Sequence, residues 1–303
     1  MKSTVVPIHT IESELSRKDI IAGLVELSKA RLSLMVILTS AAGFYMGHKG
    51  NPDWFYTFCM TISGTALLAI SAAALNQVLE ISHDSNMDRT KDRPLVTRLF
   101  STSFAVKFGI ITATLGFSAL IAGANPLTAI LGLATLIIYL FVYTPLKRIS
   151  IWNTLVGALP GALPPLMGWT AATGQIDSKG LLLFLLLFAW QIPHFMAIAW
   201  MYKDDYQKAG FKMLPSIDIN GHRCGRHAVV FSFCLTQVGL LMARQQMVGV
   251  VYVILGSLLA LGMLVFSIWF CHRPSHKTAK MLFLSSIIYL PFQLLLMVFD
   301  KNS

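Results

Sequence analysis

Three polar side chains recur every four residues in the segment N-Q-V-L-E-I-S-H-D, which follows a long apolar run: Asn76, Glu80 and Asp84. If the apolar helix continues, residues four apart lie along one of its faces. Acids stacked at that spacing repel each other, and the negative end of the helix dipole disfavours them further. A divalent cation bound through their oxygens removes both penalties. We therefore expect a metal site here, with Asp88, one turn further, as an optional ligand.

Basic residues come directly after these acids, in M-D-R-T-K-D-R-P-L at positions 87–95. Arg89, Lys91 and Arg93 carry donors that suit a phosphate. Metal-binding acids beside phosphate-binding bases indicate diphosphate chemistry at a membrane surface. A solvated loop of ordinary ion pairs is the competing interpretation, and it fits Lys91 and Asp92 best.

A second polar set lies in the segment W-Q-I-P-H-F-M-A-I-A-W-M-Y-K-D-D-Y at positions 190–206. The members that follow one side of the expected helix are Gln191, His194, Tyr202, Asp205 and Tyr206. Polar side chains aligned along an apolar helix predict a cavity lining. His194 has either a direct role there or the packed, hydrogen-bonded role that a lone histidine often has. Asp204 and Asp205 are expected to contact the metal or the diphosphate.

A third segment, Y-T-P-L-K-R-I-S-I-W-N at positions 143–153, supplies Lys147 and Arg148 as further phosphate donors. Asn153 lies one turn inside the next apolar run, where we expect it to reach the cavity. Residues 157–168 then mix glycine, alanine and proline. This mixture predicts an interrupted helix that borders a cavity, packs closely through its small residues, or does both.

The elements that must position these residues span a membrane. The 303 residues are 55% hydrophobic and only 13% charged, with a mean hydropathy of +0.65, whereas a soluble domain carries about 25% charged residues. The apolar runs are long and unbroken, which indicates helices rather than a β-barrel. The net charge of +10 is explained by basic residues on the cytoplasmic side, so we expect no nucleic-acid partner. The cysteine spacing indicates neither a metal site nor disulfides.

Nine apolar segments are long enough to span a bilayer once their flanks are included. We place them at 31–48, 55–80, 101–123, 126–144, 151–171, 180–202, 228–246, 248–270 and 279–299. Residues 1–30 form a separate N-terminal tail and interfacial helix, the helix at 18–29 having Ile20, Ile21, Leu24 and Val25 on one side. Residues 31–303 form one nine-span domain around a central cavity.

The distribution of basic residues predicts the orientation. With the N-terminus in the cytoplasm, only Lys49, Lys179, Arg244 and Lys301, among 24 lysines and arginines, lie on the opposite side. An odd number of spans places the C-terminus on that opposite side as well. The two long loops, 81–100 and 203–227, then share the cytoplasmic face. Both begin with acids and continue with bases, which suggests a weak internal repeat whose acidic clusters face one cavity.

These motifs resemble those of the UbiA-type intramembrane prenyltransferases. The resemblance rests on N-x3-E-x3-D at Asn76, Glu80 and Asp84 with the following M-D-R-T-K-D-R-P-L, on Y-T-P-L-K-R, and on W-Q-I-P-H-F with Y-K-D-D-Y-Q-K-A-G-F-K-M-L. It covers essentially the whole chain. The first motif marks the superfamily, and the last is more specific for its heme-modifying branch. The chain departs from many relatives at Ile81 and Ser82, where they carry a basic and an acidic residue.

The resemblance implies an enzyme that transfers a farnesyl group from farnesyl diphosphate to a vinyl group of heme b, giving heme O for heme-copper oxidases. It implies Mg²⁺, with two ions, held by Asn76, Glu80, Asp84, Asp204 and Asp205, of which all but Asp204 are catalytic. The diphosphate would be bound by Arg89, Lys91, Arg93, Lys147 and Arg148. Heme b or the cavity would be contacted by Gln191, His194, Tyr202, Tyr206 and Asn153, with His194 either as a ligand of the heme iron or facing the porphyrin.

The resemblance further implies a multi-pass protein of the bacterial plasma membrane and a partner that assembles the oxidase or forms heme A. One alternative is prenyl transfer to an aromatic acid or a quinone precursor, although Tyr202 and Tyr206 stand where quinone-type relatives usually carry two aspartates. A secondary transporter or a non-catalytic assembly factor is the alternative from another class. Transporter sites lie near the bilayer midplane, whereas the acids here gather at segment ends, which disfavours transport.

Overall fold

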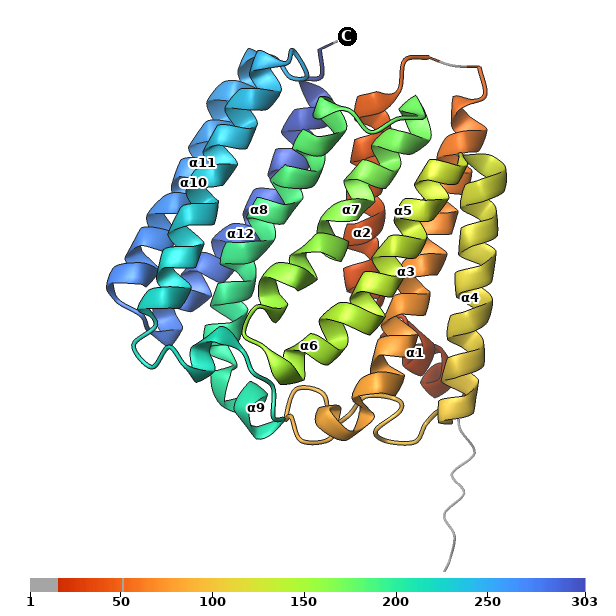
Figure 1. Cartoon of the computed structure of the whole chain (residues 1–303), viewed down its shortest axis with the longest axis vertical. Helices are drawn as coiled ribbons and strands as arrows, with labels where there is room; N and C mark the ends of the chain where they lie inside the picture. The colour runs from red at the N-terminus through yellow and green to blue at the C-terminus, as the bar shows by residue number, and fades with distance from the viewer. Residues whose placement is uncertain (1–15, 51, 303) are drawn as a thin grey trace, which may run out of the picture.

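The computed structural model describes residues 16–50 and 52–302, which are helical almost throughout (Figure 1). In chain order the elements are α1 (Arg17–Leu27), α2 (Ala30–Gly47), α3 (Trp54–Asp84), α4 (Thr102–Gly123), α5 (Pro126–Ile137), the π-helix η1 (Ile138–Tyr143), α6 (Thr144–Ile149), α7 (Asn153–Thr173), α8 (Ser178–Met201), α9 (Lys203–Lys208), the 3-10 turn η2 (Leu214–Ser216), α10 (His222–Arg244), α11 (Val250–His272) and α12 (His276–Phe299). The prediction of an all-α membrane protein is confirmed.

Eight of the helices in the described part of the chain are long and apolar enough to cross a bilayer. They are α2, α3, α4, the continuous run Pro126–Ile149, α8, α10, α11 and α12. The remaining expected span, 151–171, corresponds to α7, which is not among the eight. The count of nine spans and the orientation of the termini remain predictions.

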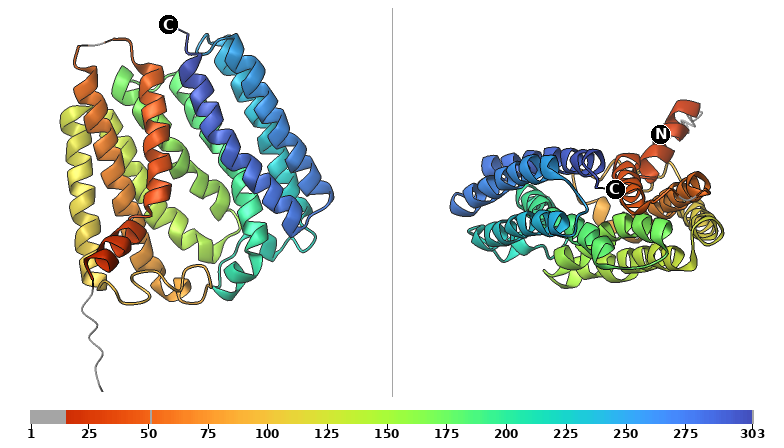
Figure 2. Two further views of the ribbon diagram at one scale, coloured as in Figure 1. Left: turned by 180° about the vertical axis from the view of Figure 1, so that it is seen from behind. Right: turned by 90° about the horizontal axis from the view of Figure 1, so that it is seen from above.

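The long helices run side by side, and their ends gather at two poles of the molecule (Figure 2). Helix α3 packs along α4, α2 along α7, and α10 along both α8 and α11. One pole carries α1, α6, α9 and the loop that follows α3, whereas the last described residues lie at the other pole (Figures 1 and 2). The polar ends of α3 and α6 therefore meet at one end of an apolar bundle.

Helix α7 is continuous, so the interruption predicted for residues 157–168 is wrong. Its three internal prolines are buried inside the bundle, where neighbouring helices stabilise a proline-containing helix. The segment instead does both other things expected of it: it packs closely, and Gly157, Pro160, Gly161 and Pro164 line an apolar cavity. A Cβ atom on Gly168 would overlap the carbonyl oxygen of Ser40, and one on Gly43 would overlap that of Pro165. The two glycines therefore let α2 and α7 approach backbone to backbone.

Helix α1 is the N-terminal helix expected at 18–29, and a capping box between Ser16 and Asp19 begins it. Residues 1–15, which the sequence assigns to a tail, lie outside the described residues. Gln77 on α3 holds the end of α1 by donating from Nε2 to the carbonyl oxygens of Glu26 and Leu27, at 3.2 and 3.0 Å. The chain then turns sharply at Lys29, whose φ of 45° is left-handed, and α2 begins. This turn directs Lys29 toward α3.

Candidate active site

A polar cavity of about 710 Å³ lies at the pole that carries α1 and α9. The charged side chains in its lining are Glu26, Lys29, Arg31, Glu80, Asp84, Arg89, Arg93 and Lys147. An apolar chamber of about 240 Å³ lies deeper in the bundle, between α2, α3, α5, α7 and α8. Lys29, Leu32, Tyr139 and Tyr143 border both spaces. The polar cavity and the apolar chamber therefore adjoin, and a ligand with a charged head and an apolar tail could occupy both.

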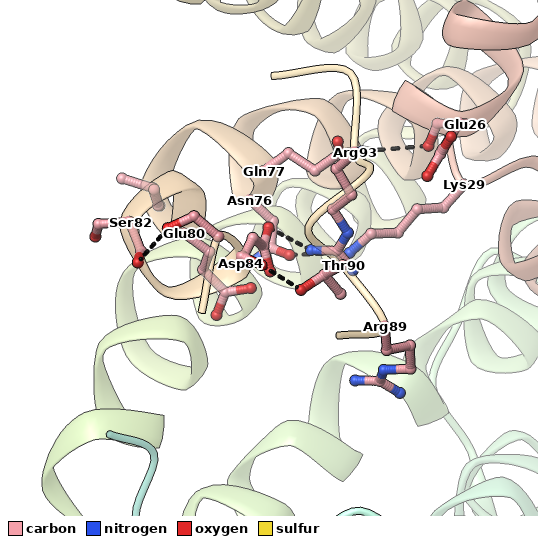
Figure 3. Close-up of polar contacts among 12 residues, drawn as sticks. Glu26, Lys29, Asn76, Gln77, Glu80, Ser82, Asp84, Arg89, Thr90 and Arg93 are labelled. Atoms are coloured by element: carbon pink, nitrogen blue, oxygen red, sulfur yellow. Dashed lines mark hydrogen bonds and ion pairs between the residues drawn. The ribbon is translucent and has the colours of Figure 1, made fainter. Parts of the chain in front are cut away.

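The three residues spaced along the last turns of α3 are all buried, with exposed fractions of 0% for Asn76, 3% for Glu80 and 1% for Asp84. Each faces a basic side chain, as Figure 3 shows for two of them. Lys29 Nζ donates to Asn76 Oδ1 at 3.0 Å, and Lys147 Nζ donates to Glu80 Oε1 at 2.8 Å. Arg93 Nη1 donates to Asp84 Oδ2. A row of buried side-chain oxygens thus lies directly against a row of cations.

The three cations come from different parts of the chain. Arg93 belongs to the loop after α3, and Lys147 lies in the last turn of α6, just past the π-helix. Both were predicted to bind phosphate. Lys29 was not among the predicted site residues, because in the sequence it is only a basic residue flanking the first span. Burial, with Arg93 nearby, lowers the pKa of Lys29 to about 7, so an incoming anion would favour its charged form.

One atom of this row, Asp84 Oδ1, is buried without a hydrogen-bond partner among the described residues. A buried carboxylate oxygen normally has a partner, so its orphan state indicates a site for a missing donor or cation. No group of three or more His, Cys, Asp and Glu residues that could hold a metal occurs in the described part of the chain. The donors at hand are two carboxylates and the amide oxygen of Asn76. This set fits Mg²⁺, which keeps waters and substrate phosphates among its ligands rather than a complete protein cage.

Arg89 faces the predicted aromatic pair. Its guanidinium lies 5.1 Å from the ring centre of Tyr202 and 5.5 Å from that of Tyr206, and Nη2 donates to the Tyr206 hydroxyl at 3.3 Å. Arg89 and Tyr206 line the polar cavity. The structure therefore brings the loop after α3 and α9 together, as the two long loops suggested.

The two acids of α9 take no part in the contact between Arg89 and the tyrosines. Asp204 is exposed and Asp205 half-buried, and neither lines the polar cavity. The structure thus does not bring them into one cluster with Glu80 and Asp84. Tyr206 of α9, and Tyr202 just before this helix, face Arg89 instead.

Three further predicted residues do not line the cavity: Asp88, Lys91 and Arg148. Lys91 pairs with the exposed Asp88 at 3.1 Å, which matches the solvated ion-pair interpretation. Lys208 also approaches Asp88, at 3.9 Å. Arg148 Nη2 donates to the carbonyl oxygen of Leu79 at 2.7 Å and so ties α6 to α3.

The segment after α9, residues 209–213, covers part of the polar cavity through Phe211 and Met213. It is held on two sides. The Ala209 carbonyl oxygen lies 2.8 Å from His83 Nδ1, and the Lys212 carbonyl oxygen accepts from Asn153 Nδ2 at 2.8 Å. Asn153 is fully buried and does not line the cavity. It therefore positions the covering segment instead of reaching the cavity as predicted.

Gln191 and His194 turn to different sides of α8. Gln191 lines the apolar chamber and donates from Nε2 to the Leu187 carbonyl oxygen at 3.0 Å. The Nδ1 atom of His194 lies 2.8 Å from the Ser286 hydroxyl of α12, and its ring lies 5.1 Å from each of the rings of Trp190 and Phe283. His194 borders neither the polar cavity nor the chamber. Its surroundings are those of a packed, hydrogen-bonded histidine.

Two adjoining spaces, one charged and one apolar, at the end of a bundle of membrane helices define an intramembrane transferase for a charged, lipid-like substrate. Residues 36–289 match the UbiA prenyltransferase family, and the chain belongs to this family. It is 37% identical to a protoheme IX farnesyltransferase from Solibacter usitatus over 286 residues, which cover 91% of this chain and 98% of that relative.

Solved structures share the fold at low sequence identity. A digeranylgeranylglyceryl phosphate synthase matches 92% of this chain and 98% of its own, with a TM-score of 0.77 at 14% identity. A UbiA homolog from Archaeoglobus fulgidus, described as bound to DMAPP and Mg²⁺, matches 90% of this chain and 98% of its own, with a TM-score of 0.63 at 16% identity.

Proposed function

We propose that this chain transfers the farnesyl group of farnesyl diphosphate to a vinyl group of heme b and so makes heme O. The observation that carries the proposal is the row of acids paired with cations at the mouth of an apolar chamber. Relatives that cover nearly the whole chain are named protoheme IX farnesyltransferase, which supports the choice of both substrates.

In this proposal the polar cavity takes the diphosphate and the chamber takes the farnesyl chain. Lys29, Arg93 and Lys147 donate to the diphosphate oxygens as the allylic C–O bond breaks, which stabilises the leaving group. The rings of Tyr139 and Tyr143, which border both spaces, face the allylic carbon and stabilise its positive charge. The apolar walls keep bulk water away from that carbon. The terminal vinyl carbon of heme b then forms the new C–C bond, and a water molecule adds to the adjacent carbon and loses a proton.

Asn76, Glu80 and Asp84 would hold Mg²⁺ in this site. The metal would supply charge neutralisation for the departing diphosphate. The Archaeoglobus homolog, described as bound to DMAPP and Mg²⁺, supports the choice of this metal. A second ion, bound with help from Asp205 or Asp204, completes the proposed pair and would require α9 to turn those acids inward.

Heme b would enter from the side of α8 and α9, where Tyr202, Tyr206 and Gln191 were predicted to contact it. His194 as a ligand of the heme iron would require its ring to leave Ser286. We further propose a bacterial plasma-membrane location, with the mitochondrial membrane of similar eukaryotic proteins as the alternative. A partner that receives heme O follows from the poor solubility of the product.

The decisive experiment is mass spectrometry of hemes extracted from membranes that contain the chain, supplied with heme b and farnesyl diphosphate. We expect a product heavier than heme b by one farnesyl group and one hydroxyl group, together with released diphosphate. Prenylated aromatic acid with unchanged heme would favour the alternative enzyme. Solute movement without diphosphate release would favour a transporter.

Metal removal should stop the reaction. We expect EDTA to abolish diphosphate release and added Mg²⁺ to restore it, because the carboxylates of Glu80 and Asp84 would otherwise face the diphosphate as like charges. The measurement is diphosphate release in purified membranes against free Mg²⁺ concentration. Turnover that is unchanged in EDTA would mean that Lys29, Arg93 and Lys147 stabilise the diphosphate without a metal.

The apolar chamber should limit the length of the prenyl chain. Ala69 lines this chamber on α3, so Ala69→Phe should shorten the accepted chain. We expect about a tenfold or greater loss of kcat/KM with farnesyl diphosphate and a smaller loss with geranyl diphosphate, since overpacking costs about 1–3 kcal/mol. Ala122→Phe, at an exposed position of α4, is the control. Equal losses with farnesyl diphosphate and geranyl diphosphate would mean that the prenyl chain does not lie in this chamber.

A further inference from the structure

A second large cavity, of about 930 Å³, is lined by residues of the opposite pole of the bundle. The last described residues lie at this pole (Figure 2). The walls of the cavity are the C-terminal end of α2, the connection between α7 and α8, the residues after α10, and Val298, Phe299, Lys301 and Asn302. Helix α3 runs between the two poles, and its 31 residues correspond to roughly 45 Å. This cavity is therefore separate from the candidate active site.

The cavity is lined by most of the few basic side chains at its pole. Lys49, Lys179 and Lys301 line it, together with His48. The sequence places only one other lysine or arginine at this end, Arg244, which is not in the lining. Basic residues are generally sparse on one side of a membrane protein. The presence of three of them around one cavity therefore points to an anionic ligand.

The acid in the lining does not cancel this charge locally. Asp177 begins α8, where its Oδ1 accepts from the backbone N–H of Gly180 at 2.9 Å. Lys301, by contrast, is fixed in place. Its Nζ donates to the carbonyl oxygens of Tyr45 and His48, at 2.8 Å each, and lies 5.0 Å from the Tyr45 ring centre. An ammonium has three N–H donors, so one remains for a ligand.

The oxygens of a phosphate or a carboxylate are the acceptors that suit ammonium groups best. The three lysines around this cavity therefore indicate an anionic ligand.

An apolar groove of about 560 Å³ adjoins this cavity. The groove lies between α2, the start of α3 and the end of α12, and its lining includes Phe44, Trp54, Phe58 and Leu295. Tyr45, His48 and Val298 border both spaces. Lys301, which donates to the first two of these residues, marks the place where the cationic cavity meets the groove. A ligand that fills both must have an anionic head and an apolar body.

We propose that the cavity and groove together bind an anionic phospholipid, independently of the catalytic function. Its phosphate contacts Lys49, Lys179 and Lys301, and an acyl chain lies in the groove. The position suits a lipid, because the head lies at a pole of the bundle and the groove continues along the apolar helices toward the middle. A bound lipid of this kind clamps the end of α2 to α12.

The test uses the full chain, purified in detergent, stripped of lipid and titrated with phosphatidylglycerol or phosphatidylcholine. We expect phosphatidylglycerol to raise the unfolding temperature and to survive as an adduct in native mass spectrometry, with phosphatidylcholine far weaker. The double variant K49A/K179A should weaken phosphatidylglycerol binding by at least about tenfold. Arg244→Ala, at the same pole but outside the cavity, should leave binding within about twofold.

Equal binding of the two lipids, or equal losses in K49A/K179A and Arg244→Ala, would overturn the proposal. So would full competition by inorganic phosphate, which would indicate a site for a free anion. A heme absorbance shift that depends on His48 and is displaced by phosphatidylglycerol would assign the site to heme instead.

Discussion

Asp84→Asn should lower the rate of farnesyl transfer by at least about 100-fold, since a bound metal contributes several kcal/mol of transition-state stabilisation. The substitution keeps the size of the side chain and the hydrogen-bonding capacity of Oδ1 but removes the charge that a divalent cation requires. Asp84 is 1% exposed and one of its oxygens is without a partner among the described residues. The measurement is diphosphate release in membranes that contain equal amounts of folded protein.

Asp88→Asn is the matched control, because Asp88 is the next acid in the same four-residue series but is exposed and pairs with Lys91. We expect it to retain activity within about twofold, since an exposed ion pair contributes little. Wild-type turnover by Asp84→Asn would remove the metal assignment. A large loss in Asp88→Asn would instead extend the metal site beyond the end of α3.

The sequence predicts the acidic row well because two simple rules apply to it. A four-residue spacing defines one helical face, and charged groups at membrane depth need a function or a partner. Asn76, Glu80 and Asp84 therefore stand out as one set from their spacing alone. Lys147 is predicted for a related reason, since it follows an apolar run and precedes the next one at the same pole.

Lys29 was missed because its role depends on backbone geometry that the sequence does not display. A left-handed residue between α1 and α2 directs its side chain toward Asn76, and this conformation is unusual for any residue but glycine. Gln77, which anchors the end of α1, was overlooked for the same reason. The sequence did contain one signal for Lys29, which is a charged residue at the junction of an interfacial helix and a membrane span.

The placement of His194 was harder for a different reason. Residues three apart on a helix are offset by about 60° around its axis, and in a crowded bundle that offset is enough to face different neighbours. Gln191 thus lies against α7 while His194 lies against α12. The acids of α9 pose a similar problem, since spacing alone does not give the orientation of a six-residue helix, and here Tyr206 rather than an acid faces Arg89.

A double-mutant cycle on Glu80 and Lys147 should separate their contribution to stability from their contribution to catalysis. Their side chains are 5% and 15% exposed and their charges meet at 2.8 Å. Removing one partner leaves a buried charge uncompensated, so Glu80→Gln and Lys147→Gln should each destabilise the protein by about 3–5 kcal/mol. The double variant E80Q/K147Q removes both charges, and we expect its unfolding midpoint to return close to that of the wild type.

Activity should behave differently in the same cycle. Glu80 would hold the metal and Lys147 would contact the diphosphate, so each single variant should lose at least about 100-fold in rate and the double variant should recover none of it. Unfolding midpoints and diphosphate release, measured on the same three preparations, provide the comparison. If the double variant regained turnover together with stability, the pair would be a structural clamp, and catalysis would rest on Asp84, Arg93 and Lys29.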